Sequence, residues 1–231
     1  MGLAFLPIEI DVQLPDEQKL LEFCNQHKLV IPKEDNHSWW WNVIPVVMRA
    51  DREVVYNNPK ELQNLIANRY NTNIGTPQYL NDIDKIFPEI PYMLNQLPFI
   101  EMTTVVIMQQ KEAVDYHIDI NDFDSILDHS ELAYELEPRR YNILLNKHEY
   151  KDCFFVSHEQ GGEKVYPLIP KDRPCHVISN GYFAHGADYC GPDKMMLCVI
   201  GGILDRPRHL KMIQDNYNKF RNDAIMFGDI L

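Results

Sequence analysis

The chain has 231 residues and a formal net charge of −12 at pH 7, and 45% of its residues are hydrophobic. This composition is typical of a globular protein with a large core, and an acidic chain without a basic stripe is a poor partner for nucleic acid. No apolar run approaches the length of a membrane span, and the first residues lack the basic region of a signal peptide. We therefore expect no membrane association, and a small molecule or a protein side chain as the partner. The sequence predicts no particular oligomeric state.

The cysteines are scattered along the chain, and no two of them form a CxxC pair. Their number is odd, and they stand at Cys24, Cys153, Cys175, Cys190 and Cys198. Unclustered cysteines in an odd number are typical of reduced thiols rather than of a disulfide framework. The sequence therefore predicts a reduced, cytoplasmic protein.

Residues 1–98 are predicted to be mainly helical. Apolar residues at helical spacing predict helices over 16–25 and 59–70, and a third helix over 80–97 is interrupted by two prolines. Two short strands, at 5–10 and 43–48, are also predicted in this part. Three adjacent tryptophans at 39–41 precede the second strand, where they would either cover an edge of the core or line a substrate pocket.

From residue 99 onward, short apolar segments alternate with turn residues. Strands are predicted at 99–110, 116–120, 140–146, 153–156, 164–170, 176–179 and 194–204, and a final helix at about 208–222. Many short strands in succession indicate an antiparallel sandwich or a jelly roll. We predict a single domain of mainly β structure with flanking helices, whose jelly-roll core spans about residues 99–205.

The chemistry of the chain is concentrated in the predicted strand at 116–120. His117 and Asp119 are two residues apart, so in a strand their side chains point to the same face. The best candidate for a third ligand is His185, which follows the predicted strand at 176–179. Two histidines and one carboxylate with open coordination positions are the ligands of non-haem Fe(II) oxygenases. HxD alone is a short pattern that also arises by chance in a chain with nine histidines.

The order of these residues resembles the Fe(II)/2-oxoglutarate-dependent oxygenases, most closely their aspartyl/asparaginyl and prolyl hydroxylase-like branches. The resemblance rests on the HxD motif of His117 and Asp119, on the late His185, and on a basic residue about ten positions further, Lys194. The segment 140–146 also matches the Arg-x-x-φ-x-Leu-Asn strand that is frequent in that family. The resemblance implies a double-stranded β-helix (jelly roll) in which His117, Asp119 and His185 bind Fe(II).

The resemblance further implies 2-oxoglutarate and O2 as co-substrates. The distal carboxylate of 2-oxoglutarate needs a buried cation, and both Lys194 and Arg140 remain candidates. Much of the family has Arg at the position of Lys194. Tyr141 or Asn142 is expected to add a neutral hydrogen bond. The implied activity is hydroxylation of an amino-acid side chain, free or within a polypeptide.

Two other functions remain open. The first is a catalytically silent jelly-roll or cupin-like binding protein, in which the same polar residues bind a ligand without turnover. The second is a cupin-type metal enzyme that does not use 2-oxoglutarate, although the chain has no HxH motif. The acidic segment at 121–137 would form either a lid or a solvated loop. Tyr116 is expected to face away from the metal, because neighbouring residues of a strand point to opposite faces.

Overall fold

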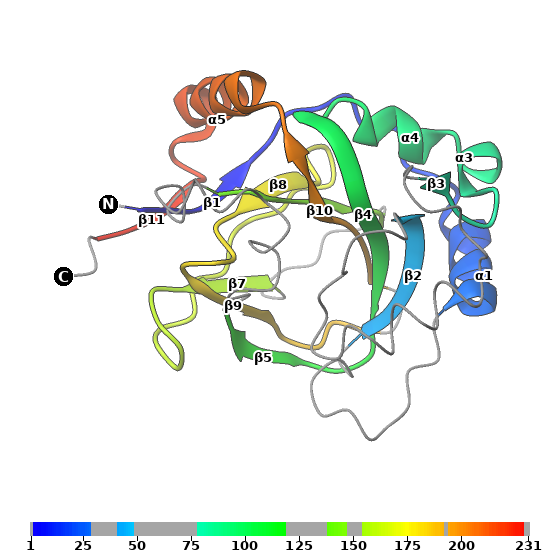
Figure 1. Ribbon diagram of the computed structural model, residues 1–231. Helices are drawn as coiled ribbons and strands as arrows, with labels where there is room; N and C mark the ends of the chain where they lie inside the picture. Colours follow the sequence, from blue (N-terminus) through cyan, green and yellow to red (C-terminus); the bar gives the residue numbers. More distant parts are fainter. Residues whose placement is uncertain are drawn as a thin grey trace.

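The computed structural model describes residues 2–28, 41–48, 78–118, 138–146, 154–191 and 194–228. These ranges form two antiparallel sheets with a few helices, so the protein is mainly β with flanking helices as predicted (Figure 1). Several predicted features lie outside these ranges, namely Asp119, Cys153, the helix at 59–70, the acidic segment at 121–137, and Trp39 and Trp40.

Within the part of the chain that the structure describes, the larger sheet has eight strands in the order β11-β1-β8-β6-β10-β4-β2-β3. Their bounds are β1 Gly2–Pro7, β2 Trp41–Met48, β3 Gln78–Tyr79, β4 Phe99–Gln110, β6 Arg140–Leu144, β8 Cys175–Ile178, β10 Met195–Leu204 and β11 Ile225–Phe227. All neighbouring pairs are antiparallel. The long strands β4 and β10 pair along most of their lengths and form the centre of this sheet.

The smaller sheet has the order β5-β9-β7. Its strands are β5 Val114–His117, β9 Ala184–Ala187 and β7 Phe154–Ser157. From β4 to β10, consecutive strands belong alternately to the larger and the smaller sheet. Such alternation between two antiparallel sheets is consistent with the predicted jelly roll.

The larger sheet has a different core on each face. Its outer face packs against α1 (Glu17–His27), α3 (Ile83–Ile86) and α4 (Glu89–Leu94), which lie together on one side of the sheet (Figure 1). Its inner face packs against the smaller sheet, with Leu144 and Ile178 contacting Phe154 and Val156 of β7. Because side chains alternate along a strand, each residue of the larger sheet faces either the helices or the space between the sheets.

The flanking helices begin at capping residues that the sequence supplies. Asp16 caps α1 by accepting a hydrogen bond from the backbone N–H of Lys19 at 2.9 Å, and Asp205 caps the last helix, α5 (Arg206–Phe220), in the same way. Leu20 and Phe23 bury the inner side of α1. In α5, His209 is buried, and its Nδ1 lies 2.8 Å from the hydroxyl of Tyr141 on β6. This contact joins α5 to the outer face of the larger sheet.

Several strands differ from the prediction. The strands predicted at 5–10 and 43–48 are present as β1 and β2, which belong to the larger sheet together with β3, a strand that was not predicted. The strand predicted at 116–120 is β5, which ends at His117. The segment predicted as a strand at 164–170 makes only an isolated bridge between Val165 and Val156. Pro167 and Pro170 explain this difference, because proline has no N–H to donate to a neighbouring strand. The short strands β9 and β11 were not predicted.

The cysteines are in two states. Cys24, Cys175 and Cys198 are free and buried, and burial raises the pKa of the Cys24 thiol to about 12. Cys190 is disulfide-bonded, so the prediction of reduced thiols is wrong for this residue. Among the helices that the structure describes, none is both long and apolar enough to cross a membrane.

Candidate functional site

His117 and His185 lie side by side on neighbouring strands of the smaller sheet. The register of β5 and β9 pairs them directly, and their ring centroids are 4.2 Å apart with 50° between the ring planes. His185 is buried, and the ring of Phe154 on β7 lies 6.4 Å from it. Paired residues on adjacent strands point to the same face of the sheet. The two imidazoles therefore project together toward the core between the sheets, where Phe154 is packed.

A backbone carbonyl orients the ring of His117. Nδ1 of His117 lies 2.9 Å from the carbonyl oxygen of Asp115. Because a carbonyl oxygen only accepts, Nδ1 is the nitrogen that carries the proton in this contact. The neutral ring then keeps the lone pair of Nε2, as in metal-binding histidines whose other nitrogen donates to a backbone carbonyl.

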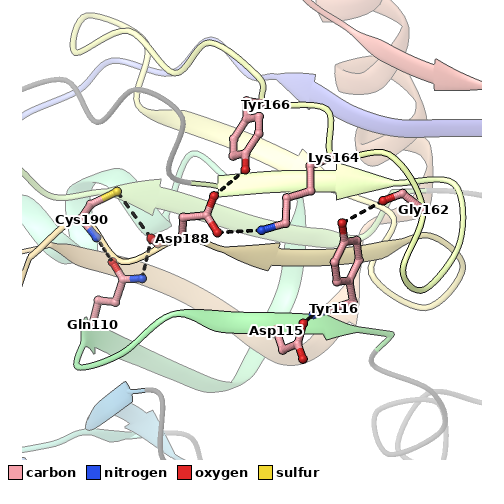
Figure 2. A network of polar contacts seen from close by, with 8 residues as sticks. All are labelled: Gln110, Asp115, Tyr116, Gly162, Lys164, Tyr166, Asp188 and Cys190. Atoms are coloured by element: carbon pink, nitrogen blue, oxygen red, sulfur yellow. Dashed lines mark hydrogen bonds and ion pairs between the residues drawn. The ribbon is translucent and has the colours of Figure 1, made fainter.

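Behind the two histidines, a polar network braces the outer face of the smaller sheet (Figure 2). Nζ of Lys164 lies 2.7 Å from one carboxylate oxygen of Asp188, and the hydroxyl of Tyr166 donates to the other. Gln110, at the end of β4, donates to the backbone carbonyl of Asp188 at 2.9 Å. The hydrogen bonds from Lys164 and Tyr166 lower the pKa of Asp188, which keeps the carboxylate ionised. Asp188 directly follows β9, so this network fixes the end of the strand that carries His185.

Tyr116 belongs to the same outer face. Its hydroxyl donates to the carbonyl of Gly162 at 2.8 Å, and its ring centroid lies 4.8 Å from that of Phe155. The prediction that Tyr116 faces away from the His117 side is therefore confirmed. Gly186, next to His185, also faces outward, where an added Cβ would lie 2.4 Å from the ring of Phe155 and 2.5 Å from the carbonyl oxygen of Val114. The three strands thus approach each other closely behind the histidine pair.

The opposite wall is the inner face of the larger sheet, where Lys194 directly precedes β10. Met195 and Leu197 belong to the core on the helix side, so Lys194 and Cys198 point inward by strand alternation. Lys194 is only 3% exposed. Burial lowers the pKa of its ammonium group to about 8, and the nearby Cys198 opposes this effect.

Arg140 and Asn142 lie on the same inner face, on β6. The Nη2 atom of Arg140 lies 3.8 Å from Sδ of Met108 on β4, so its side chain extends across β10. Burial, together with the positive charges of Lys194 and Arg140, lowers the pKa of His176, on β8, to about 3. His176 thus shows that both candidate cations reach the same region of the inner face.

Tyr141 lies on the other face of the larger sheet. It is fully buried in the core beside the helices, and its hydroxyl contacts His209 of α5. Its ring packs edge-to-face against Phe99 at 5.7 Å. This placement disagrees with the expectation that Tyr141 binds the co-substrate. The alternation of side chains along β6 explains the difference, because Arg140 and Asn142 take the inward positions.

The third expected ligand, Asp119, lies outside the described residues. The strand β5 ends at His117. Within the ranges that the structure describes, no group of three His, Cys, Asp or Glu side chains is placed to hold a metal ion. The described part of the expected centre is therefore the histidine pair.

The side chains present fit the cofactors that the sequence resemblance implies. Two adjacent imidazoles, one of which donates through Nδ1 to a backbone carbonyl, suit a divalent iron centre, to which a carboxylate from Asp119 would add the third donor. Lys194 and Arg140 on the facing wall suit an anionic chelator. Sequence reasoning did not select His176 as a site residue, because its only signal was its place in a predicted strand nine residues before His185.

No protein-family model and no curated protein matches the chain. Among solved structures, the chain is similar to the crystal structure of an oxidoreductase of the 2OG-Fe(II) oxygenase family from Burkholderia pseudomallei. The two share 13% sequence identity over 80% of each chain, with a TM-score of 0.32. A likeness this distant carries no argument about the activity of the chain.

Proposed function

We propose that the protein is an Fe(II)- and 2-oxoglutarate-dependent dioxygenase that hydroxylates an amino-acid side chain, free or within a polypeptide. The observation that carries this proposal is the direct pairing of His117 with His185. The sequence singled out these two residues as metal ligands although 68 positions separate them, and the fold places their rings in contact distance. In this proposal the two sheets are the halves of a jelly roll, and the site lies between them.

Each side chain has a defined task in the proposed reaction. His117 and His185, with Asp119, hold the iron, which together with 2-oxoglutarate and O2 supplies the oxidising chemistry. The residues of the larger sheet hold 2-oxoglutarate by its distal carboxylate. The buried apolar side chains between the sheets, which include Phe154, would keep water away from the reaction.

Lys194 is the better anchor for that carboxylate. It is 3% exposed, whereas Arg140 is half-buried and extends toward Met108. A charge-assisted hydrogen bond is stronger when water is excluded from it, so the more buried cation gives the tighter contact. Asn142 adds the neutral hydrogen bond. Arg140 lies close enough to reinforce the positive potential of the inner face.

The test of this function separates binding from turnover. The wild type, His117→Ala and His185→Ala are incubated with Fe(II), ascorbate and 2-oxoglutarate, and succinate is measured with and without a panel of amino acids and peptides. We expect succinate from the wild type and a loss of at least about 100-fold in both variants, because each removes a metal ligand. Tyr141→Phe is the matched control, and we expect it to retain activity because Tyr141 lies on the helix side of the sheet.

Binding of 2-oxoglutarate is measured in parallel by calorimetry under anaerobic conditions. Metal-dependent binding without any succinate, even with the full panel, would favour the catalytically silent binding protein. Failure of the wild type to bind 2-oxoglutarate in the presence of Fe(II) would contradict the proposed function. Lys194→Met and Arg140→Met, compared in the same assay, identify the anchor, and we expect the larger loss of affinity from Lys194→Met.

A further inference from the structure

Lys164 lies on a segment that folds back along the smaller sheet. After β7 the chain turns at 158–162 and returns, so that Val165 and Val156 exchange two backbone hydrogen bonds of 2.9 Å and 3.0 Å. The side chain of Val165 packs against the core between the sheets. Because side chains alternate along an extended segment, Lys164 and Tyr166 point to the opposite, outer face. Figure 2 shows both side chains directed at Asp188 on that face.

The ammonium group of Lys164 reaches residues on or next to all three strands of the smaller sheet. Its Nζ lies 4.3 Å from the ring centroid of Phe155 on β7 and 5.6 Å from that of Tyr116 on β5. At both distances a cation is attracted to the face of an aromatic ring. The same Nζ lies 2.7 Å from Oδ1 of Asp188, which directly follows β9. One side chain therefore connects β5, β9 and β7 from behind.

The partners of Lys164 flank the two histidines of the candidate site. Tyr116 directly precedes His117, and Asp188 lies three residues after His185. Neighbouring residues of a strand point to opposite faces, so contacts on the outer face fix the backbone from which the imidazoles project on the inner face. The position of Lys164 is thus coupled to the distance and the angle between the two rings.

The strand β5 depends on these contacts because its backbone pairing is irregular. It lies at one end of the described smaller sheet, and its register with β9 shifts between Val114 and His117. Such an irregularity interrupts the ladder of hydrogen bonds that would otherwise hold the strand in place. The hydroxyl of Tyr116, which donates to the carbonyl of Gly162, and the contact of its ring with Lys164 therefore hold the end of β5 that carries His117.

We propose that Lys164 is a positioning residue that sets the spacing and direction of the His117 and His185 imidazoles for a divalent metal ion. The inference rests on the proposed function, in which that ion is Fe(II). Lys164 lies on the outer face of the sheet and acts through Tyr116 and Asp188. The side chains of Lys164 and Asp188 are 32% and 42% exposed, so their ion pair contributes little to the stability of the fold. Its loss should therefore affect metal binding more than thermal unfolding.

The test measures the affinity of the full-length protein for Co(II) by calorimetry without oxygen, together with the visible absorption spectrum of the bound ion. Lys164→Met keeps the length of the side chain but removes its charge. We expect it to weaken Co(II) binding about tenfold and to alter the spectrum, which depends on the arrangement of the ligands. Lys164→Arg can still pair with Asp188 and lie over the ring of Phe155, and we expect it to recover most of the affinity and the wild-type spectrum.

Lys211→Met is the matched control. Lys211 forms an ion pair of 2.6 Å with Asp215 on α5, which lies apart from the smaller sheet (Figure 1). This variant removes the same charge from the molecule as Lys164→Met does. We expect it to bind Co(II) with wild-type affinity and spectrum, so a loss confined to Lys164→Met is a property of the site and not of the net charge.

A double-mutant cycle tests whether Lys164 acts through Asp188. We expect Lys164→Met combined with Asp188→Asn to lose less affinity for Co(II) than the sum of the two single losses. Fully additive losses, or a lower Tm of Lys164→Met with wild-type affinity and spectrum, would overturn the inference and leave the proposed function intact. A wild type that does not bind Co(II) would contradict the metal centre of the proposed function as well, so the two failures are distinguishable.

Discussion

In the proposed function, Lys194 is the residue whose positive charge attracts the carboxylate to the inner face of the larger sheet. Burial lowers its pKa to about 8, so the ammonium form is present below that value and is lost as the pH rises through it. We therefore expect the Kd for 2-oxoglutarate, measured with Mn(II) by calorimetry, to increase about tenfold between pH 7 and pH 9. Lys194→Arg stays charged across this range and should remove the increase. An equal pH dependence in the two proteins would show that another group controls binding.

The sequence was sufficient to choose candidate site residues, because few side-chain types can bind a metal ion. The HxD spacing made His117 a candidate ligand, and His185 followed as the candidate late in the strand-rich part. The contact between them depends on the register of β5 and β9, which no local pattern specifies. The sequence Arg-Tyr-Asn-Ile of β6 alternates, which separates Tyr141 from Arg140 and Asn142, but this pattern does not tell which of the two faces of the strand lines the candidate site.

Gly186 shows how tightly the elements behind the histidine pair are packed. A Cβ at this position would lie 2.5 Å from the carbonyl oxygen of Val114 and 2.4 Å from the ring of Phe155, so β5 or β7 would have to move. We expect Gly186→Ala to destabilise the protein by about 1–3 kcal/mol, which corresponds to a fall in Tm of several degrees. Gly181→Ala is the matched control, because a Cβ there meets nothing within 4 Å. Equal Tm values for the two variants in calorimetric scans would contradict the close packing of these strands.

Elements with a long, regular pattern were predictable, and short ones were not. The strand β4 was predicted with its observed bounds, and α1 and β10 were predicted within a few residues. The strand β9 has the sequence Ala-His-Gly-Ala, which contains no β-branched residue, so only its pairing with β5 and β7 makes it a strand. The fold class follows from the long elements, whereas the site depends on the short ones.

At the scale of the whole molecule, two buried histidines couple folding to pH. His209 joins α5 to the outer face of the larger sheet, and His176 lies on the inner face. Burial lowers the pKa of His209 to about 4, with Arg139 and Arg206 adding to the effect, and that of His176 to about 3. An unfolded histidine binds a proton as the pH falls below its ordinary pKa of about 6.5. In the folded protein both histidines stay neutral to a lower pH, because their pKa values are lower.

The sign of the resulting pH dependence follows from proton counting. Between pH 6.5 and pH 4 the unfolded chain holds more protons on these residues than the folded protein, so stability falls as the pH is lowered through this range. Each histidine contributes about 1.4 kcal/mol per pH unit to that fall.

His209→Gln tests the contribution of His209 to this pH dependence. In urea unfolding at several pH values between 7 and 4.5, we expect the slope of the free energy of unfolding against pH to be smaller by about the contribution of one histidine. Tyr141→Phe should instead lower stability by a similar amount at every pH, because it removes the contact with His209 but leaves the titrating ring buried. If the free energy of unfolding of His209→Gln depended on pH as steeply as that of the wild type, His209 would not be a source of the pH dependence.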